Sequence, residues 1–168
     1  MSIPILSIVG KSKVGKTTLL ESLIPELKRR GYRLATIKHH SHPGFEIDLP
    51  GKDTWRHAQA GSDVVVIAAP DRIASIRRLE KELTIDEIAA SILDVDLILT
   101  EGFKRSGKPA IEVLRAEKGL ELLCQPPQLV AVASDIHIQV GVPQFNLNDV
   151  AGIADFIEEF CRRTLPQS

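Results

Sequence analysis

Residues 10–17 read Gly-Lys-Ser-Lys-Val-Gly-Lys-Thr and match the pattern Gly-x-x-x-x-Gly-Lys-Ser/Thr at every fixed position. The apolar run Ile3 to Val9 comes directly before this stretch, and after Lys16 leucine and isoleucine recur at helical spacing. A glycine-rich turn between a strand and a helix points several backbone N–H groups into one concavity, and the positive helix end adds to the attraction for phosphate. The stretch therefore predicts a phosphate-binding loop. The alternative is a glycine-rich turn with an incidental Lys-Thr pair.

The loop and the first residues of the helix supply the expected nucleotide contacts: Gly10, Lys11, Ser12, Lys13, Val14, Gly15, Lys16, Thr17 and Thr18. We expect Lys16 to reach the β- and γ-phosphates and to act in catalysis, and the Thr17 hydroxyl to bind Mg²⁺. The spacing around Lys11 resembles the loop of dimeric NTPases such as the nitrogenase iron protein and MinD, whose lysine reaches the partner's phosphates. A solvated surface lysine is the alternative. Kinases, ATPases and GTPases share such loops, so the motif predicts nucleotide binding but not the reaction.

Strand and helix patterns alternate along the rest of the chain, which is typical of an α/β protein. The opening strand, helix and strand at 33–38 form a βαβ unit, and Pro25 predicts a kink or a shorter first helix. We therefore expect a P-loop NTPase-type three-layer fold, with a mostly parallel twisted sheet and flanking helices. No repeat or linker is visible, so residues 1–168 are expected to form a single nucleotide-binding domain. The further expected strands are 63–69, 72–77, 95–100, 109–115 and 129–133, and the further expected helices are 54–60, 84–93 and 150–162.

The chain has 168 residues, of which 43% are hydrophobic and 26% are charged, and its formal net charge is -1. This length suffices for a substantial core, and the balanced charge disfavours wholesale binding to nucleic acid or to a membrane surface. Cys124 and Cys161 form neither a disulfide framework nor a CxxC pair and are expected to be packing residues. No targeting pattern or bilayer-length apolar run is visible. We therefore expect a cytoplasmic protein.

Acidic residues at the carboxyl ends of parallel strands are candidates for metal binding, because ligands bind beyond these ends. Glu101 closes the apolar strand at 95–100 and is expected to hold Mg²⁺ through water or to orient the attacking water. Asp48, in the loop after the second strand, is a second candidate for Mg²⁺, and a solvated Pro-Gly turn is the alternative there. Asp96 begins its strand and belongs at the opposite end, where a structural role is favoured.

Two further groups of polar residues are candidates for recognition. His39, His40 and His42 follow the second strand and together have the chemistry to bind Zn²⁺ or Ni²⁺, an anionic substrate or a protein partner. No cysteine or carboxylate lies at a familiar structural-site spacing, so a metal is disfavoured. The NKxD motif of guanine recognition is absent, but Asp135 follows the strand at 129–133. Its carboxylate would accept from the N1–H and amine of guanine, and an ordinary turn acid is an equal alternative.

Six stretches taken together resemble one known family along nearly the whole chain. They are GKSKVGKTTLL (10–20), IKHHSH (37–42), FEIDLPGKDTWRHAQAGS (45–62), DLILTEGFK (96–104), AVASD (131–135) and NLNDVAGIADFI (146–157). The chain is similar to the MobB family of molybdopterin-guanine dinucleotide biosynthesis adapter proteins. The histidine stretch, the loop around Pro-Gly-Lys-Asp and the stretch ending in Thr-Glu-Gly-Phe-Lys are more specific than the phosphate loop alone.

The resemblance implies a homodimeric protein that binds GTP and Mg²⁺ and has weak intrinsic GTPase activity. It further implies a role beside the MobA-type guanylyltransferase that attaches GMP to the molybdenum cofactor, with molybdopterin as a second expected partner. By the same resemblance, Gly15, Lys16 and Thr17 are phosphate and Mg²⁺ residues, Asp48 and Glu101 are metal-side acids, and Asp135 gains support as a base-side residue.

The sequence leaves three functions open. The first is a slow GTPase that acts as an adapter, since no side chain stands out as an arginine finger or a catalytic glutamine. The second is a binding module that holds GTP or the pterin dinucleotide without functional turnover. The third is a P-loop kinase for a small metabolite, with the loop at 39–53 as its acceptor site.

Overall fold

Strand β1 (Ile5–Val9) lies in the middle of a six-stranded sheet, with its side chains buried on both faces. The computed structural model describes residues 3–40, 44–45 and 47–164. The sheet has the order β2-β5-β1-β6-β7-β8, and every neighbouring pair is parallel. Its other strands are β2 (Leu34–Lys38), β5 (Leu97–Glu101), β6 (Ala110–Leu114), β7 (Leu129–Ser134) and β8 (Gln144–Asn146).

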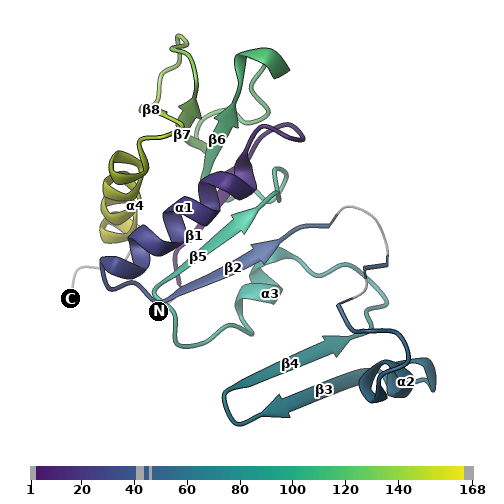
Figure 1. The fold of residues 1–168 in the computed structure, drawn as a ribbon. Helices are drawn as coiled ribbons and strands as arrows, with labels where there is room; N and C mark the ends of the chain where they lie inside the picture. Colours follow the sequence, from purple (N-terminus) through teal and green to yellow (C-terminus); the bar gives the residue numbers. More distant parts are fainter. Residues whose placement is uncertain (1–2, 41–43, 46, 165–168) are drawn as a thin grey trace. The chain divides into compact units, whose positions relative to one another are not determined.

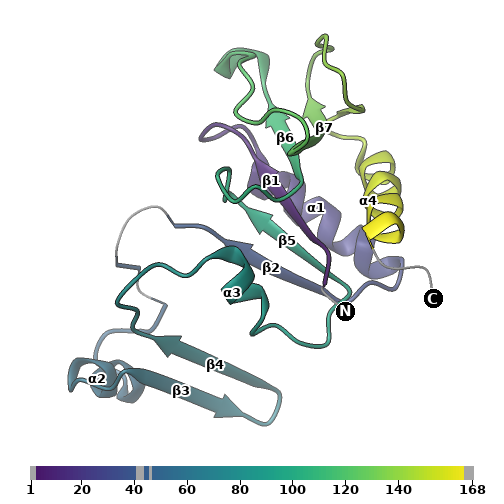
Figure 2. The same cartoon turned by 180° about the vertical axis from the view of Figure 1, so that it is seen from behind.

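Helices α1 (Lys16–Arg29) and α4 (Val150–Thr164) cover one face of this sheet, and the short α3 (Ile85–Ala89) lies over the other (Figures 1 and 2). The main core forms between the sheet and the two long helices, because their leucines and isoleucines recur at helical spacing. Its fully buried large side chains include Leu6, Ile8, Leu23, Leu27, Leu97, Leu99, Ile153 and Ile157. The expected three-layer α/β fold with a parallel sheet is confirmed.

Helices α1 and α3 differ from what the sequence predicts. Helix α1 continues through Pro25 to Arg29 and is not shortened; Pro25 and Glu21, whose carbonyl loses its helical donor, are both exposed to water. Helix α3 ends at Ala89, four residues before the predicted end, and begins with a capping box formed by Thr84 and Glu87. Within the described residues, no helix has the length and apolar character needed to cross a membrane.

Residues His40–Leu83 form a compact unit of their own, and Met1–His39 together with Thr84–Ser168 form the other. The smaller unit contains α2 (Asp53–Gln59) and an antiparallel hairpin of β3 (Val64–Ala69) and β4 (Arg72–Arg77), close to the bounds predicted for them. A single domain was expected from the sequence, so this division into two units was not predicted.

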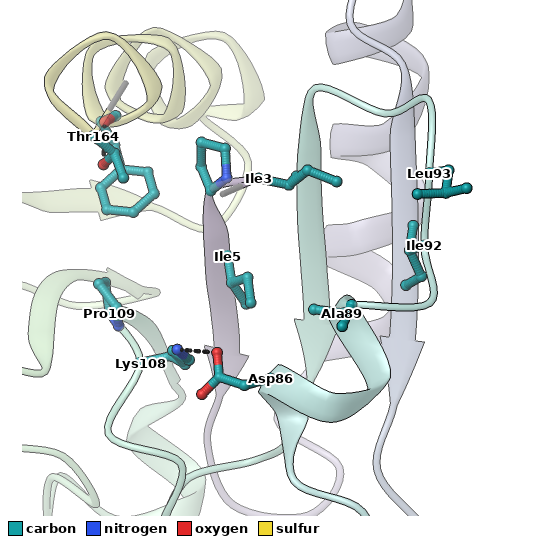
Figure 3. Close-up of a pocket in the computed structure, with 12 residues that line it drawn as sticks. Ile3, Ile5, Asp86, Ala89, Ile92, Leu93, Lys108, Pro109 and Thr164 are labelled. Carbon is teal, nitrogen blue, oxygen red and sulfur yellow. Dashed lines mark hydrogen bonds and ion pairs between the residues drawn. The ribbon is translucent and has the colours of Figure 1, made fainter. Parts of the chain in front are cut away.

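The larger unit contains a mostly apolar cavity of about 510 Å³ at the amino end of β1 (Figure 3). Its walls come from the residues leading into β1, from α3 and from the last turn of α4, and the ion pair of Lys108 with Asp86 lies at its rim. The phosphate loop follows the opposite, carboxyl end of β1. This cavity is therefore not the nucleotide site that the sequence predicts.

Candidate nucleotide-binding site

The carboxyl ends of β1, β5 and β6 meet at one edge of the sheet, because the three strands are parallel neighbours. The residues from Gly10 to Gly15 leave β1 at this edge and lead directly into α1. Glu101 is the last residue of β5, and Arg115 follows the last residue of β6. The edge therefore brings the phosphate loop together with an acid and a cation from distant parts of the sequence.

Two glycines are required for the path of the loop. A Cβ at Gly10, whose φ is +146°, would lie 2.5 Å from the Val113 carbonyl oxygen, so the chain passes too close to β6 for any side chain. Gly15 has a φ of 101° and precedes the first turn of α1, in the left-handed conformation that glycine adopts without strain. Val14 between them is buried in the core and anchors the loop.

Lys13 also lies in the left-handed region, with a φ of 61°. A side chain there carries a steric cost that a glycine would avoid. Ser12, Lys13 and Thr18 are exposed, as expected for residues at the mouth of a binding loop. Lys11 differs from the solvated lysine considered above: its Nζ donates to the Lys118 carbonyl at 3.1 Å and lies 3.5 Å from Glu121 Oε2 of its own chain.

Lys16 is half-buried and folds back over its own loop. Its Nζ donates to the carbonyls of Gly10 at 3.1 Å and Lys11 at 2.7 Å. Burial lowers the pKa of Lys16, the charge of Glu101 opposes this effect, and the charge of Lys38 adds to it. The ammonium group therefore lies at the centre of the loop, where it can meet a phosphate.

Thr17 and Glu101 are brought together as the sequence predicts. The Thr17 hydroxyl donates to Glu101 Oε1 at 2.9 Å, and the Lys38 Nζ lies 3.6 Å from the same oxygen. The Glu101 side chain is 15% exposed, so its carboxylate is held at the sheet edge rather than in open solvent. A hydroxyl oxygen and a carboxylate oxygen therefore lie side by side, and Mg²⁺ prefers oxygen ligands of this kind.

Asp135 lies just beyond β7, on the same edge as the loop. Its Oδ1 accepts from the Ala116 N–H at 3.0 Å, and its Oδ2 lies 3.9 Å from an Arg115 guanidinium nitrogen. The Arg115 Nε in turn donates to the Val14 carbonyl at 3.1 Å. Arg115 thus belongs to this site but was not predicted. The rule that ligands bind at the carboxyl ends of parallel strands was applied only to acidic residues.

Asp48 belongs to the smaller unit, and its Oδ1 accepts from the Leu49 N–H at 2.8 Å. Its expected role at the metal stays a prediction. Of the histidines, the His39 ring lies 4.7 Å from the Phe103 ring and the His40 ring 6.2 Å from the Phe45 ring, while His42 lies outside the described residues. The described part of the chain holds no cluster of three potential metal ligands.

Two structural roles predicted from the sequence are confirmed. Asp96 lies just before β5, at the amino edge of the sheet, and binds both the backbone N–H and the guanidinium of Arg33. Cys124 and Cys161 are free thiols buried in the two cores of the larger unit. None of these residues belongs to the nucleotide edge.

Comparison with known sequences identifies the family. A family model described as MobB, molybdopterin guanine dinucleotide synthesis protein B, matches residues 5–135. The molybdopterin-guanine dinucleotide biosynthesis adapter protein of Haemophilus influenzae is 39% identical over 160 residues, which cover 94% of this chain and 89% of that protein. The protein of the same description from Escherichia coli is 38% identical over 167 residues, or 96% of this chain and 95% of that protein.

Solved structures agree with the sequence comparison. A crystal structure of molybdopterin-guanine biosynthesis protein B has a TM-score of 0.73 and 36% identity and covers 93% of this chain and 99% of its own. The structure of Bacillus subtilis MobB has a TM-score of 0.75 and 27% identity and covers 94% of this chain and 97% of its own. Because the family model spans most of the chain and two relatives match along nearly their whole length, this chain belongs to the MobB family.

Proposed function

We propose that this protein binds GTP and Mg²⁺ at residues 10–18, hydrolyses GTP slowly, and acts as an adapter in the cytoplasmic synthesis of molybdopterin guanine dinucleotide. Membership of the MobB family supports the pathway and the adapter role. The observation that supports nucleotide binding most directly is the hydrogen bond of Thr17 to Glu101 beside the loop. This bond joins Thr17, the last residue of the motif, to Glu101, the last residue of β5, which pairs with β1.

The residues at this edge fit a magnesium ion. Mg²⁺ takes oxygen ligands and keeps several of its waters, so one hydroxyl and one carboxylate suffice as protein contacts. Thr17 would bind the ion directly, and Glu101 would hold it directly or through a water. When bound, the ion neutralises charge on the β- and γ-phosphates. Asp48 is proposed as a further metal-side acid.

The chain's own groups stabilise the negative charge of phosphoryl transfer. The Lys16 ammonium is already held at the loop before the reaction, by the carbonyls of Gly10 and Lys11. Electrostatic stabilisation is most effective when the stabilising groups are fixed in advance. Glu101 is placed to orient the attacking water. Arg115 donates to the Val14 carbonyl of the loop and is therefore not assigned the role of an arginine finger. Without such a finger, hydrolysis is expected to be slow unless a partner completes the site.

Base choice is assigned to Asp135. A carboxylate at this edge would accept from the N1–H and the exocyclic amine of guanine, two donors that adenine does not offer together. The substitution Asp135→Asn should therefore weaken GTP binding and reduce the preference of the protein for GTP over ATP. Competition of the two nucleotides for a fluorescent GTP analogue measures this preference.

The proposed partners are the guanylyltransferase, molybdopterin and a second copy of this chain. The β3–β4 hairpin supports self-association, because apolar side chains are exposed on the face that α2 does not cover. Val64, Val66 and Ile73 share one face of it and are 41%, 51% and 72% exposed. Helix α2 packs against β3, whose Val65 on the opposite face is buried. A second hairpin packed on these three side chains would cover them.

Thermal unfolding with Mg²⁺ and GTP, GDP, ATP or no nucleotide tests the proposal. A ligand at 100 times its dissociation constant should add about 2.7 kcal/mol of stability, and each kcal/mol raises Tm by about 2–4 °C for a chain of this size. GTP and GDP should raise Tm, and ATP should not. Stabilisation by ATP alone would contradict GTP binding and favour a small-metabolite kinase.

The variant Glu101→Gln separates a working GTPase from a holding module. The amide keeps the shape of the side chain but loses the charge that faces Thr17 and Lys38. We expect GTP hydrolysis and the stimulation of the guanylyltransferase to fall together. If stimulation persists while hydrolysis stops, turnover is not the function, and the protein holds the nucleotide for its partner.

A further inference from the structure

Arg115 connects two parts of the nucleotide edge. It lies just beyond β6, the strand next to β1 (Figure 2). Its Nε donates to the Val14 carbonyl at 3.1 Å, and its Nη1 lies 3.9 Å from Asp135 Oδ2. The guanidinium also lies alongside Gly15, where an added Cβ would be 3.5 Å from Nη2. One side chain, 40% exposed, therefore contacts the phosphate loop on one side and the base-side acid on the other.

The contact with Val14 sets the direction of a peptide unit in the loop. A peptide is planar and trans, so its C=O and its N–H point in opposite directions. Arg115 holds the Val14 carbonyl, and the N–H of Gly15, which belongs to the same peptide, must point away from Arg115. The next peptide is fixed by the helix, because the Gly15 carbonyl accepts from the Leu19 N–H at 2.9 Å. In loops of this pattern the backbone N–H groups hold phosphate.

We propose that Arg115 is a positioning residue for phosphate: its hydrogen bond to the Val14 carbonyl turns the Gly15 N–H toward the bound phosphate chain. Asp135 holds the guanidinium in the orientation that makes this bond. The inference rests on the proposed nucleotide binding and adds a residue from β6 that the motif itself does not contain. Because the bond is made through the Nε–H group, phosphate binding should depend more on this donor than on the charge of the guanidinium.

A pair of variants separates the donor from the charge. In Arg115→Gln the amide nitrogen lies the same number of bonds from Cα as Nε, so the donor is kept and the charge is lost. In Arg115→Met a methyl group takes that place, and both are lost. The measurement is calorimetric titration with Mg²⁺ and either GTP or inorganic tripolyphosphate, which has no base.

Arg115→Met should bind both ligands about tenfold more weakly, the effect expected for losing one charge-assisted hydrogen bond in the site. Arg115→Gln should bind both within about threefold of the unsubstituted protein. Without ligand, both variants should unfold within a few degrees of it, because the side chain is partly exposed. A merely structural role would lower Tm without separating the two variants in affinity.

Each other outcome overturns the inference in a distinguishable way. Equal losses in the two variants would show that the charge acts and not the donor. A loss for GTP but not for tripolyphosphate would show that Arg115 acts on the base through Asp135. Unchanged binding in Arg115→Met would overturn this inference and leave the proposed function standing. If the unsubstituted protein binds neither ligand, both the inference and the proposed function fail.

Discussion

Gly10 shows how a single position decides the shape of the phosphate loop. Its Cβ would lie 2.5 Å from the backbone oxygen of Val113, and neither backbone can yield without moving β1 or β6. We therefore expect Gly10→Ala to lower the free energy of unfolding by about 1–3 kcal/mol, the range for a strained backbone position. It should also abolish measurable nucleotide binding. Thermal unfolding with and without Mg²⁺-GTP checks both effects.

Gly141 provides the matched control for this substitution. It has no positive φ, and an added Cβ meets nothing within 4 Å. Gly141→Ala should therefore leave Tm and nucleotide binding unchanged. Equal Tm values for the Gly10 and Gly141 variants would contradict the close approach described for the loop.

The two buried cysteines should be unreactive in the native protein. Cys124 and Cys161 are each 2% exposed, and burial raises the pKa of Cys161 to about 11 and also raises the pKa of Cys124. Because the thiolate is the reactive form, neither cysteine should react with Ellman's reagent in the native protein at mildly alkaline pH. Both should react after unfolding in urea. Rapid labelling of the native protein would contradict the packing described for the two thiols.

The residues of the site divide into those that a motif reveals and those that the fold brings together. Lys16 and Thr17 follow from the motif, and Glu101 follows from the rule that ligands bind at the carboxyl ends of parallel strands. Arg115 also follows an apolar strand, and the same rule applied to cations would have found it. The contact of Lys11 with Glu121 is different: nothing in the spacing of these two residues indicates that they meet.

Helices α1 and α4 are joined by an ionic network whose strength depends on pH. Arg30 binds Glu26 of α1 and both Asp155 and Glu158 of α4. Hydrogen bonds from Arg29 and Arg30 lower the pKa of Glu26 from 4.5 to about 2. A carboxyl group whose pKa is lower in the folded state stabilises the protein above its unfolded pKa. That contribution is complete above about pH 4.5 and is lost as the pH falls toward 2.

The variant Glu26→Gln should therefore unfold at lower urea concentration than the unsubstituted protein at neutral pH. The difference between their midpoints should shrink as the pH is lowered from 5 to about 3, because protonation removes the same charge from the unsubstituted protein. Glu21→Gln, at an exposed position of the same helix, is the control and should show little change. A constant midpoint difference across this pH range would contradict the assigned role of Glu26.

Among the helices and strands, those with long apolar patterns were predicted well and the short ones were not. Strands β1, β5 and β6 are buried on both faces, so their sequences are mostly apolar and are hard to miss, although each contains a polar residue. Strand β8 has three residues at the sheet edge and was missed. Helix α3 was predicted too long, because Ile92 and Leu93 continue its apolar spacing but instead line the cavity at the amino end of β1.

The whole molecule consists of two units that differ in how they bury apolar groups. The larger one has two continuous cores, whereas the smaller one exposes Val66, Ile67 and Ile73 of its hairpin. The apolar run at 64–69 and the pattern at 72–77 predict strands β3 and β4, but they cannot tell a hairpin that forms its own sheet from one that joins the six-stranded sheet. That difference depends on which strands pair over long distances in the sequence, and local periodicity carries no information about such pairing.

If a second copy covers this hairpin, a charge on its exposed face should separate the copies. Val66 is 51% exposed and pairs with Ser75, so Val66→Lys fits the isolated hairpin but would bury an ammonium group in the dimer. Burying an unpaired charge costs several kcal/mol, which would raise the dimer dissociation constant about a hundredfold or more. Sedimentation should give a dimer of 18.5 kDa chains for the unsubstituted protein and a monomer for the variant.

Leu93→Lys is the control for this experiment, because Leu93 is 75% exposed but belongs to the larger unit. It should remain a dimer, since the charge lies outside the hairpin. A dimer in all three proteins would show that association uses another surface, and a monomeric unsubstituted protein would remove self-association from the proposed function. If Val66→Lys is a folded monomer that still binds Mg²⁺-GTP but no longer stimulates the guanylyltransferase, the hairpin serves the adapter role and not the nucleotide site.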